Sequence, residues 1–216
     1  MKKSFAKSCN SSFANIGLKL DKKVFKETLS SLLFNETLPL HCAYNRSSIN
    51  VSEDATNDDM MQAAIGQGKT QITPMHLTMI TAAVANRGKL MKPYMIDRIE
   101  SAEGVEIKAE KAEVYRELMS EEEAAVLAEY MREVVETGTG TKLLGLSYTA
   151  AGKTGSAEYS SKKEESHAWF TGFAPAENPQ IVVTVIIEGA GSGGDYAVPM
   201  ARRVFDAYLN STAGGM

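Results

Sequence analysis

Three consecutive residues, Lys153, Thr154 and Gly155, have the composition of an anion-binding wall in a cleft. The lysine supplies a positive charge, the threonine supplies a hydroxyl donor, and the glycine has no Cβ to hold a ligand backbone away. Small residues surround them in the segment TAAGKTGSAEY (149–159). The pattern predicts an extended segment that forms an anion-binding wall of a cleft.

A second pair of residues, Ser8 and Asn10, could assist a reaction near such an anion site. The hydroxyl can pass a proton, and the amide two residues later can both donate and accept hydrogen bonds. The triplet 48–50 has the same form, and helix capping is the better interpretation of either triplet taken alone. The pair therefore has meaning only together with other motifs.

Composition and charge narrow the function classes. The chain has 216 residues and a net charge of -4, with 23 basic and 27 acidic residues, so nothing indicates nucleic-acid binding. Cys9 and Cys42 lie in no C-x-x-C or Cys/His cluster, and we expect no metal or cofactor. The apolar run 181–187 is shorter than the roughly 20 residues of a membrane span, and the opening residues resemble no export signal.

Helix and strand signals predict the elements that must position these residues. Helices are expected at 22–34, 74–86, from Glu121 onward and at 199–209, each with an apolar face. Strands are expected at 149–159, 167–174 and 181–188, with two short strands within 93–107. This order predicts an α+β domain with an antiparallel sheet flanked by helices, interrupted by a long polar connector at 35–59.

Four segments together resemble one known family: FAKSCNSSFANIG (5–17), AIGQGKTQITPMHLTMITAAVANRGKLMKP (64–93), AAGKTGSAEY (150–159) and HAWFTGFAP (167–175). Their order and spacing are similar to the later part of the transpeptidase domain of a penicillin-binding protein, most of all the class B type, over about residues 5–209. The resemblance implies the penicillin-binding protein and serine β-lactamase fold, and work outside the cytoplasmic membrane on peptidoglycan.

The resemblance also implies a role for each motif residue. Ser8 would relay a proton toward the leaving group, and Asn10 would hydrogen-bond the substrate amide. Lys153 and Thr154 would hold the carboxylate of a D-alanyl-D-alanine stem peptide or of a β-lactam, and Gly155 would allow close approach. The backbone N–H of Ser156 would form half of an oxyanion hole, and the strand edge would pair with the peptide.

The nucleophile of the family belongs to an S-x-x-K motif upstream of S-x-N, whereas only seven residues precede Ser8. Two literal S-x-x-K strings, 4–7 and 160–163, are interpreted as chance matches. We therefore expect residues 1–216 to form a transpeptidase domain incomplete at its N-terminus, inactive in isolation and prone to self-association. The alternatives are a non-catalytic peptide-binding module and a β-lactamase or β-lactam sensor of the same fold.

Two further patterns have ordinary explanations. The segment 63–70 fits a relaxed phosphate-loop pattern, but it follows a helical signal where a phosphate loop follows a strand, so nucleotide binding is not expected. The three histidines are isolated in sequence, and His76 is expected at the surface of a first helical turn. Trp169, Phe170 and Phe173 are expected to pack in the core.

Overall fold

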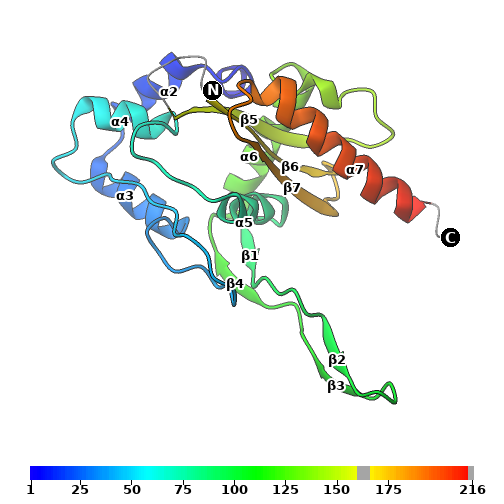
Figure 1. Cartoon of the computed structure of the whole chain (residues 1–216). Coiled ribbons are helices and arrows are strands. Elements are labelled where there is room, and N and C mark those ends of the chain that lie inside the picture. The colour runs from blue at the N-terminus through cyan, green and yellow to red at the C-terminus, as the bar shows by residue number, and fades with distance from the viewer. Residues whose placement is uncertain (160–165, 214–216) are drawn as a thin grey trace.

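Helices cover both faces of an antiparallel sheet in the computed structural model, which describes residues 1–159 and 166–213 (Figure 1). The sheet has the strand order β5-β6-β7, formed by β5 (Ala151–Glu158), β6 (Ser166–Ala174) and β7 (Ile181–Ile187). Both neighbouring pairs are antiparallel, with Thr154 opposite Phe170 in the first pair. The α+β prediction is confirmed, and β5 lies at an edge of this sheet.

Seven α-helices and two short turns of other helical types accompany the strands in the described part of the chain. They are α1 (Lys2–Ala6), α2 (Asn10–Gly17), α3 (Lys22–Ser31), α4 (Asn57–Ala64), α5 (Pro74–Ala85), α6 (Glu121–Glu136), η1 (Thr141–Leu143), η2 (Gly193–Ala197) and α7 (Val198–Ala213). The side chains of Asp21, Thr73 and Ser120 cap α3, α5 and α6, as the sequence predicts. No described helix is long and apolar enough to cross a membrane.

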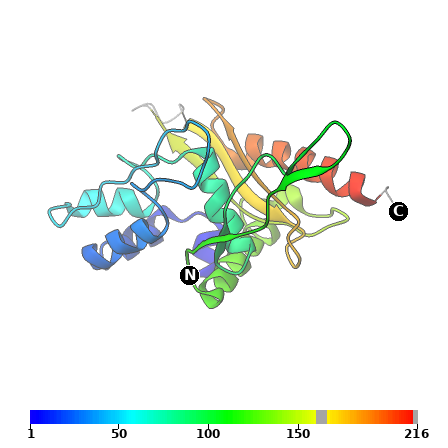
Figure 2. The same cartoon turned by 90° about the horizontal axis from the view of Figure 1, so that it is seen from below.

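The core is divided by the sheet into two layers (Figure 2). On one face Phe170 packs against α7, where its ring meets Phe205 at a centroid distance of 6.5 Å. On the other face Phe173 packs with Val84 of α5 and Met131 of α6. Because β6 is the central strand, Phe170 and Phe173 are buried on its two faces, and the core role predicted for them is confirmed. Trp169, for which the same role was predicted, is only partly buried.

A separate apolar cluster stabilises a lobe that is built from α3, α4 and the segment 35–56. Leu29, Phe34, Ile49 and Met60 are its buried members, among others. Asn35 links the two ends of the segment 35–49, because its side-chain amide donates a hydrogen bond to the Ile49 carbonyl at 2.9 Å. The lobe lies beside the sheet, and α2 and α4 form the side that faces β5 (Figure 1).

A hairpin extends away from the body below α5 (Figure 1). Its base is the pair β1 (Lys89–Met91) and β4 (Val114–Glu117), and its tip is the pair β2 (Arg98–Glu100) and β3 (Glu106–Ala109). The two strands predicted within 93–107 are thus present as β2 and β3. Every residue of β2, β3 and β4 is exposed.

Burial on two helices differs from the expectation. His76 is fully buried rather than at the surface, because its ring packs on Phe34 and its Nε2 lies 2.8 Å from the Leu32 carbonyl oxygen. The sequence pattern of α7 predicts that Ala201, Val204, Phe205 and Tyr208 are buried. Ala201 and Phe205 are, but Val204 and Tyr208 remain more than two-fifths exposed. Only one narrow side of α7 faces the sheet.

Candidate active site

The Lys153–Ser156 segment lies on β5, where the strand borders a cleft of about 660 Å³. Thr154 is 8% exposed, whereas Ser156 lies open to the cleft mouth. A Cβ on Gly155 would come 3.3 Å from the Cβ of Trp169 on β6, so a side chain there would press on the neighbouring strand. The strand therefore presents the Lys153 ammonium, the Thr154 hydroxyl and the backbone of Gly155 to the cleft.

The Ser8 turn reaches this strand from the other end of the chain. Ser8 lies between α1 and α2 with φ of 50°, a left-handed conformation that is uncommon for a serine. The Cys9 N–H donates to the Ser4 carbonyl at 2.9 Å, which closes the turn, and Asn10 then begins α2. The strained turn directs the Ser8 hydroxyl to Lys153, whose ammonium donates a hydrogen bond to it across 145 positions of sequence.

Lys153 carries a largely buried charge, which has no counter-charge among the described residues. Its ammonium also donates to the Thr154 carbonyl at 2.8 Å and lies 5.7 Å from the ring centroid of Phe5. Burial lowers the pKa of Lys153 from 10.5 to about 8, because a charge loses solvation there. Among the described residues no carboxylate forms an ion pair with it, so an anionic ligand would supply the missing partner.

The cleft brings together all six residues that the sequence proposes: Ser8, Asn10, Lys153, Thr154, Gly155 and Ser156. Other segments contribute to its walls. The loop after α4 contributes Gln67, the loop after α6 contributes Thr139, and the start of η2 contributes Gly194 and Asp195. Asp195 is paired with Lys142 at 2.7 Å on the rim.

Several cleft contacts escaped sequence reasoning. The hydroxyl of Thr139 bonds that of Thr154, and the Gly193 N–H donates to the Ser156 Oγ at 3.2 Å. Gly193 must be a glycine here, because a Cβ would lie 2.4 Å from the Gly155 carbonyl oxygen. The repeated T-G-T-G at 137–140 and the G-S-G-G at 191–194 were the available signals, since glycines in such runs mark close backbone approach.

The serine and the lysine of the literal S-x-x-K string at 4–7 lie outside the cleft. Lys7 donates to the Thr137 carbonyl, and neither Ser4 nor Lys7 lines the cleft. The string at 160–163 lies outside the described residues. The phosphate-loop pattern is also unsupported, because α4 rather than a strand precedes its glycines.

The amino-acid sequence is similar to those of known proteins. The family model for the penicillin binding protein transpeptidase domain matches residues 1–206. The peptidoglycan D,D-transpeptidase MrdA of Haemophilus influenzae is 36% identical over 168 residues, covering 70% of this chain and 26% of that protein. The peptidoglycan D,D-transpeptidase PbpA of Mycolicibacterium smegmatis is 29% identical over 219 residues, covering 97% of this chain and 44% of its own.

Solved structures agree over nearly the whole chain. The D,D-transpeptidase domain of a peptidoglycan glycosyltransferase from Eggerthella lenta superposes with a TM-score of 0.90 and 25% identity, over 98% of this chain and 53% of the other. Penicillin-binding protein A of Mycobacterium tuberculosis, solved as its penicillin G acyl-enzyme complex, gives 0.84 and 27%, over 96% and 48%. The chain thus spans about half of these structures and less than half of the curated relatives.

Fold and cleft together define an α+β domain of the kind found in peptidoglycan D,D-transpeptidases. The chain belongs to the penicillin-binding protein transpeptidase domain family, and its curated relatives are class B members.

Proposed function

We propose that this chain supplies the carboxylate-binding wall of a peptidoglycan D,D-transpeptidase cleft. Lys153 and Thr154 would hold the terminal carboxylate of a D-alanyl-D-alanine stem peptide or the equivalent group of a β-lactam. Asn10 would bond the substrate amide, Ser8 would relay a proton through its contact with Lys153, and the Ser156 N–H would face the oxyanion. The observation that carries the proposal is the buried ammonium of Lys153, which has no anionic partner among the described residues.

Binding of N-acetyl-D-alanyl-D-alanine to the chain tests this proposal. Lys153→Ala should abolish the binding, since it removes the charge that faces the carboxylate. Lys142→Ala is the matched control, because Lys142 lines the same cleft but its charge is already neutralised by Asp195. Equal loss in the two variants, or no loss in Lys153→Ala, would contradict the assignment.

The chain in isolation is proposed to bind without forming a covalent adduct. Covalent catalysis requires a hydroxyl activated by a neighbouring base. In the described cleft, Ser8 is bonded to Lys153, and that lysine is assigned to the carboxylate. Intact-mass analysis after exposure to a fluorescent penicillin should show an unchanged mass. An adduct on any serine would disprove this and would show that the chain forms an acyl-enzyme, as transpeptidases and serine β-lactamases do.

The proposed ligand also implies where the chain works. A stem-peptide ligand would place the chain on the outer side of the cytoplasmic membrane, which protease treatment of intact spheroplasts would check.

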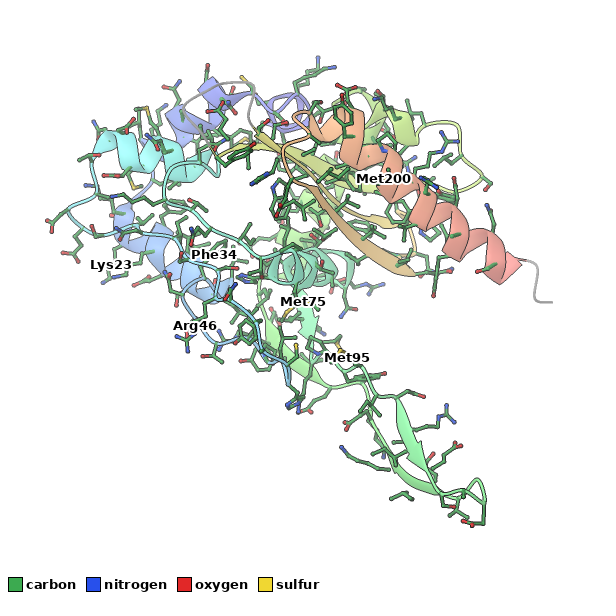
Figure 3. The ribbon with its side chains drawn as sticks, viewed as in Figure 1. Lys23, Phe34, Arg46, Met75, Met95 and Met200 are labelled. Carbon is green, nitrogen blue, oxygen red and sulfur yellow. The ribbon has the colours of Figure 1, made fainter. Side chains whose placement is uncertain are left out.

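The surface of the hairpin favours self-association. Several apolar side chains of the hairpin are exposed, including Met95 at 82%, Ile96 at 64% and Ile107 at 68%. Met95 lies between the base and the tip of the hairpin (Figure 3).

An isolated two-stranded ribbon has unpaired outer edges and gains stability when it is covered. A second copy of the chain, paired hairpin to hairpin, would cover these apolar side chains. Light scattering should show a mass that rises with protein concentration, and Ile96→Ser with Ile107→Ser should lower it. A monomer at every concentration would exclude this pairing.

A further inference from the structure

The loop that follows α4 presents one glutamine to β5. Gly66 and Gly68 have φ of 72° and 68°, and Gln67 lies between them. No atom lies within 4 Å of a Cβ built on Gly66, so this glycine serves the left-handed backbone rather than a close contact. The Gln67 N–H donates to the Gln62 carbonyl at 2.8 Å and fixes the loop to the end of α4.

The side chain of Gln67 bonds the edge of the sheet. Its Nε2 donates to the Ser156 carbonyl at 3.2 Å, across 89 positions of sequence. Backbone groups of successive residues in a strand point to opposite sides, and β6 is the only neighbour of β5 among the described strands. The carbonyls of Thr154 and Ser156 both accept bonds from side chains, so they lie on the outer edge that an added peptide strand would use.

The two outer-edge carbonyls beside the cleft therefore both accept a hydrogen bond, each from a different side chain. Lys153, which is assigned to the ligand carboxylate, bonds the Thr154 carbonyl. The Ser156 carbonyl is then the first acceptor available to a ligand N–H along the strand. Gln67 occupies this acceptor with a solvent-exposed bond at 3.2 Å, near the long end of the usual range, which a ligand can displace.

We propose that Gln67 is a placeholder donor, which holds the Ser156 carbonyl in the free protein and is exchanged for an N–H of the bound peptide. The proposal rests on the assigned carboxylate site. It makes Gln67 a specificity-determining residue: ligands that offer a strand-like N–H compete with it, whereas ligands that offer only a carboxylate do not.

Two probes and four proteins test the exchange. The probes are diacetyl-L-lysyl-D-alanyl-D-alanine, which can pair with the edge, and O-acetyl-D-lactate, which has a carboxylate but no N–H. Their dissociation constants are measured by NMR titration of the wild type, Lys153→Ala, Gln67→Ala and Gln71→Ala. Gln71 is the control because it is an exposed glutamine outside the cleft, whose backbone is hydrogen-bonded to that of Ser48.

In Gln67→Ala the tripeptide should bind about two- to tenfold more tightly, the range expected when one competing hydrogen bond is removed, while the lactate affinity stays unchanged. Gln71→Ala should match the wild type with both probes. In the ligand-free protein, the carbonyl ¹³C shift of Ser156 should move upfield in Gln67→Ala, as expected for loss of a donor.

The outcomes separate the two proposals. If the tripeptide binds and Lys153→Ala abolishes the binding, but Gln67→Ala gives no gain, the placeholder role alone is overturned. The same holds if the lactate affinity rises in parallel or if the Ser156 carbonyl shift does not change. If the wild type binds neither probe, the carboxylate site is overturned, and the role of Gln67 with it.

Discussion

At the scale of single residues, the protonation of Lys153 sets the affinity of the cleft for an anion. Burial lowers its pKa to about 8, so the ammonium is lost over a pH range in which an exposed lysine stays charged. The dissociation constant for N-acetyl-D-alanyl-D-alanine should therefore rise by at least about tenfold between pH 7 and pH 9.5. A flat profile measured by titration calorimetry would contradict the assignment of Lys153.

The stability of the ligand-free chain should change in the opposite sense. Between pH 8 and 10.5 the folded state has released the Lys153 proton and the unfolded state still binds it. The free energy of unfolding therefore increases with pH in this window. Denaturant unfolding at pH 7.5 and 10 should show this increase in the wild type and a smaller one in Lys153→Ala.

Ser8 combines a strained backbone with a required hydroxyl. Its φ of 50° favours glycine, yet the bond to Lys153 needs the side chain. Both Ser8→Gly and Ser8→Ala remove the hydroxyl, but only alanine retains the strain. We expect Ser8→Gly to be more stable than Ser8→Ala by about 1 kcal/mol in urea unfolding, with stem-peptide binding weakened alike in both. Equal stabilities would show that the turn relaxes.

At the scale of elements, the position of the Ser8 turn depends on how α1 is held against α6. The Thr139 N–H donates to the Ala6 carbonyl at 3.2 Å, so the loop after α6 fixes the end of α1. Gly138 allows this approach, because a Cβ there would lie 2.2 Å from the Ala6 carbonyl oxygen. The same loop also supplies Thr139 to the cleft.

Gly138→Ala should push α1 away from α6 and cost about 1 to 3 kcal/mol of stability, as expected for overpacking. It should also weaken stem-peptide binding, because Ser8 moves with α1. Gly140→Ala is the control in the same loop, since its Cβ would lie 3.3 Å from the Val134 carbonyl oxygen, a tight contact that requires a far smaller shift than the 2.2 Å contact at Gly138. Thermal melts and NMR titration measure both effects, and similar results for the two variants would exclude this mechanism.

At the scale of the whole molecule, α5 joins the α3–α4 lobe to the sheet. His76 makes the first link, because its Nε2 lies 2.8 Å from the Leu32 carbonyl oxygen just after α3. The hydroxyls of Thr81, Thr171 and Thr184 make the second, in a buried chain with O–O distances of 2.7 and 2.9 Å. The cleft lies where these two parts meet, so its width depends on both links.

Acid should destabilise the molecule through His76. Burial lowers the pKa of His76 below its ordinary 6.5, and its Nδ1 has no hydrogen-bond partner in the described part of the chain. As pH falls below 6.5 the unfolded chain takes up a proton that the folded state resists, so stability decreases by up to about 1.4 kcal/mol per pH unit. Urea unfolding at pH 5 and 7.5 should show a smaller loss in His76→Gln, whereas His41→Gln, at an exposed site, should behave as the wild type.

Local signals in the sequence predicted most of the elements correctly. Asp21, Thr73 and Ser120 mark helix starts through hydrogen bonds within three residues, which require no knowledge of the rest of the chain. The three sheet strands and the tip of the hairpin were likewise expected from residue type and turns. Burial was predicted less well: His76 and Tyr208 differ from expectation because the packing of distant segments decides which side of a helix is covered.

The sequence by itself determined the motif residues of the cleft and, through their order and spacing, the family. The tertiary structure alone decided that Lys153 is buried against Ser8, that Thr139 and Gly193 support β5, and that Gln67 occupies its outer edge. The physical reason is the distance in sequence over which each interaction acts. Capping and strand signals act over a few residues. The solvation of a charge and the hydrogen bonds at a strand edge depend instead on segments that only the folded chain brings together.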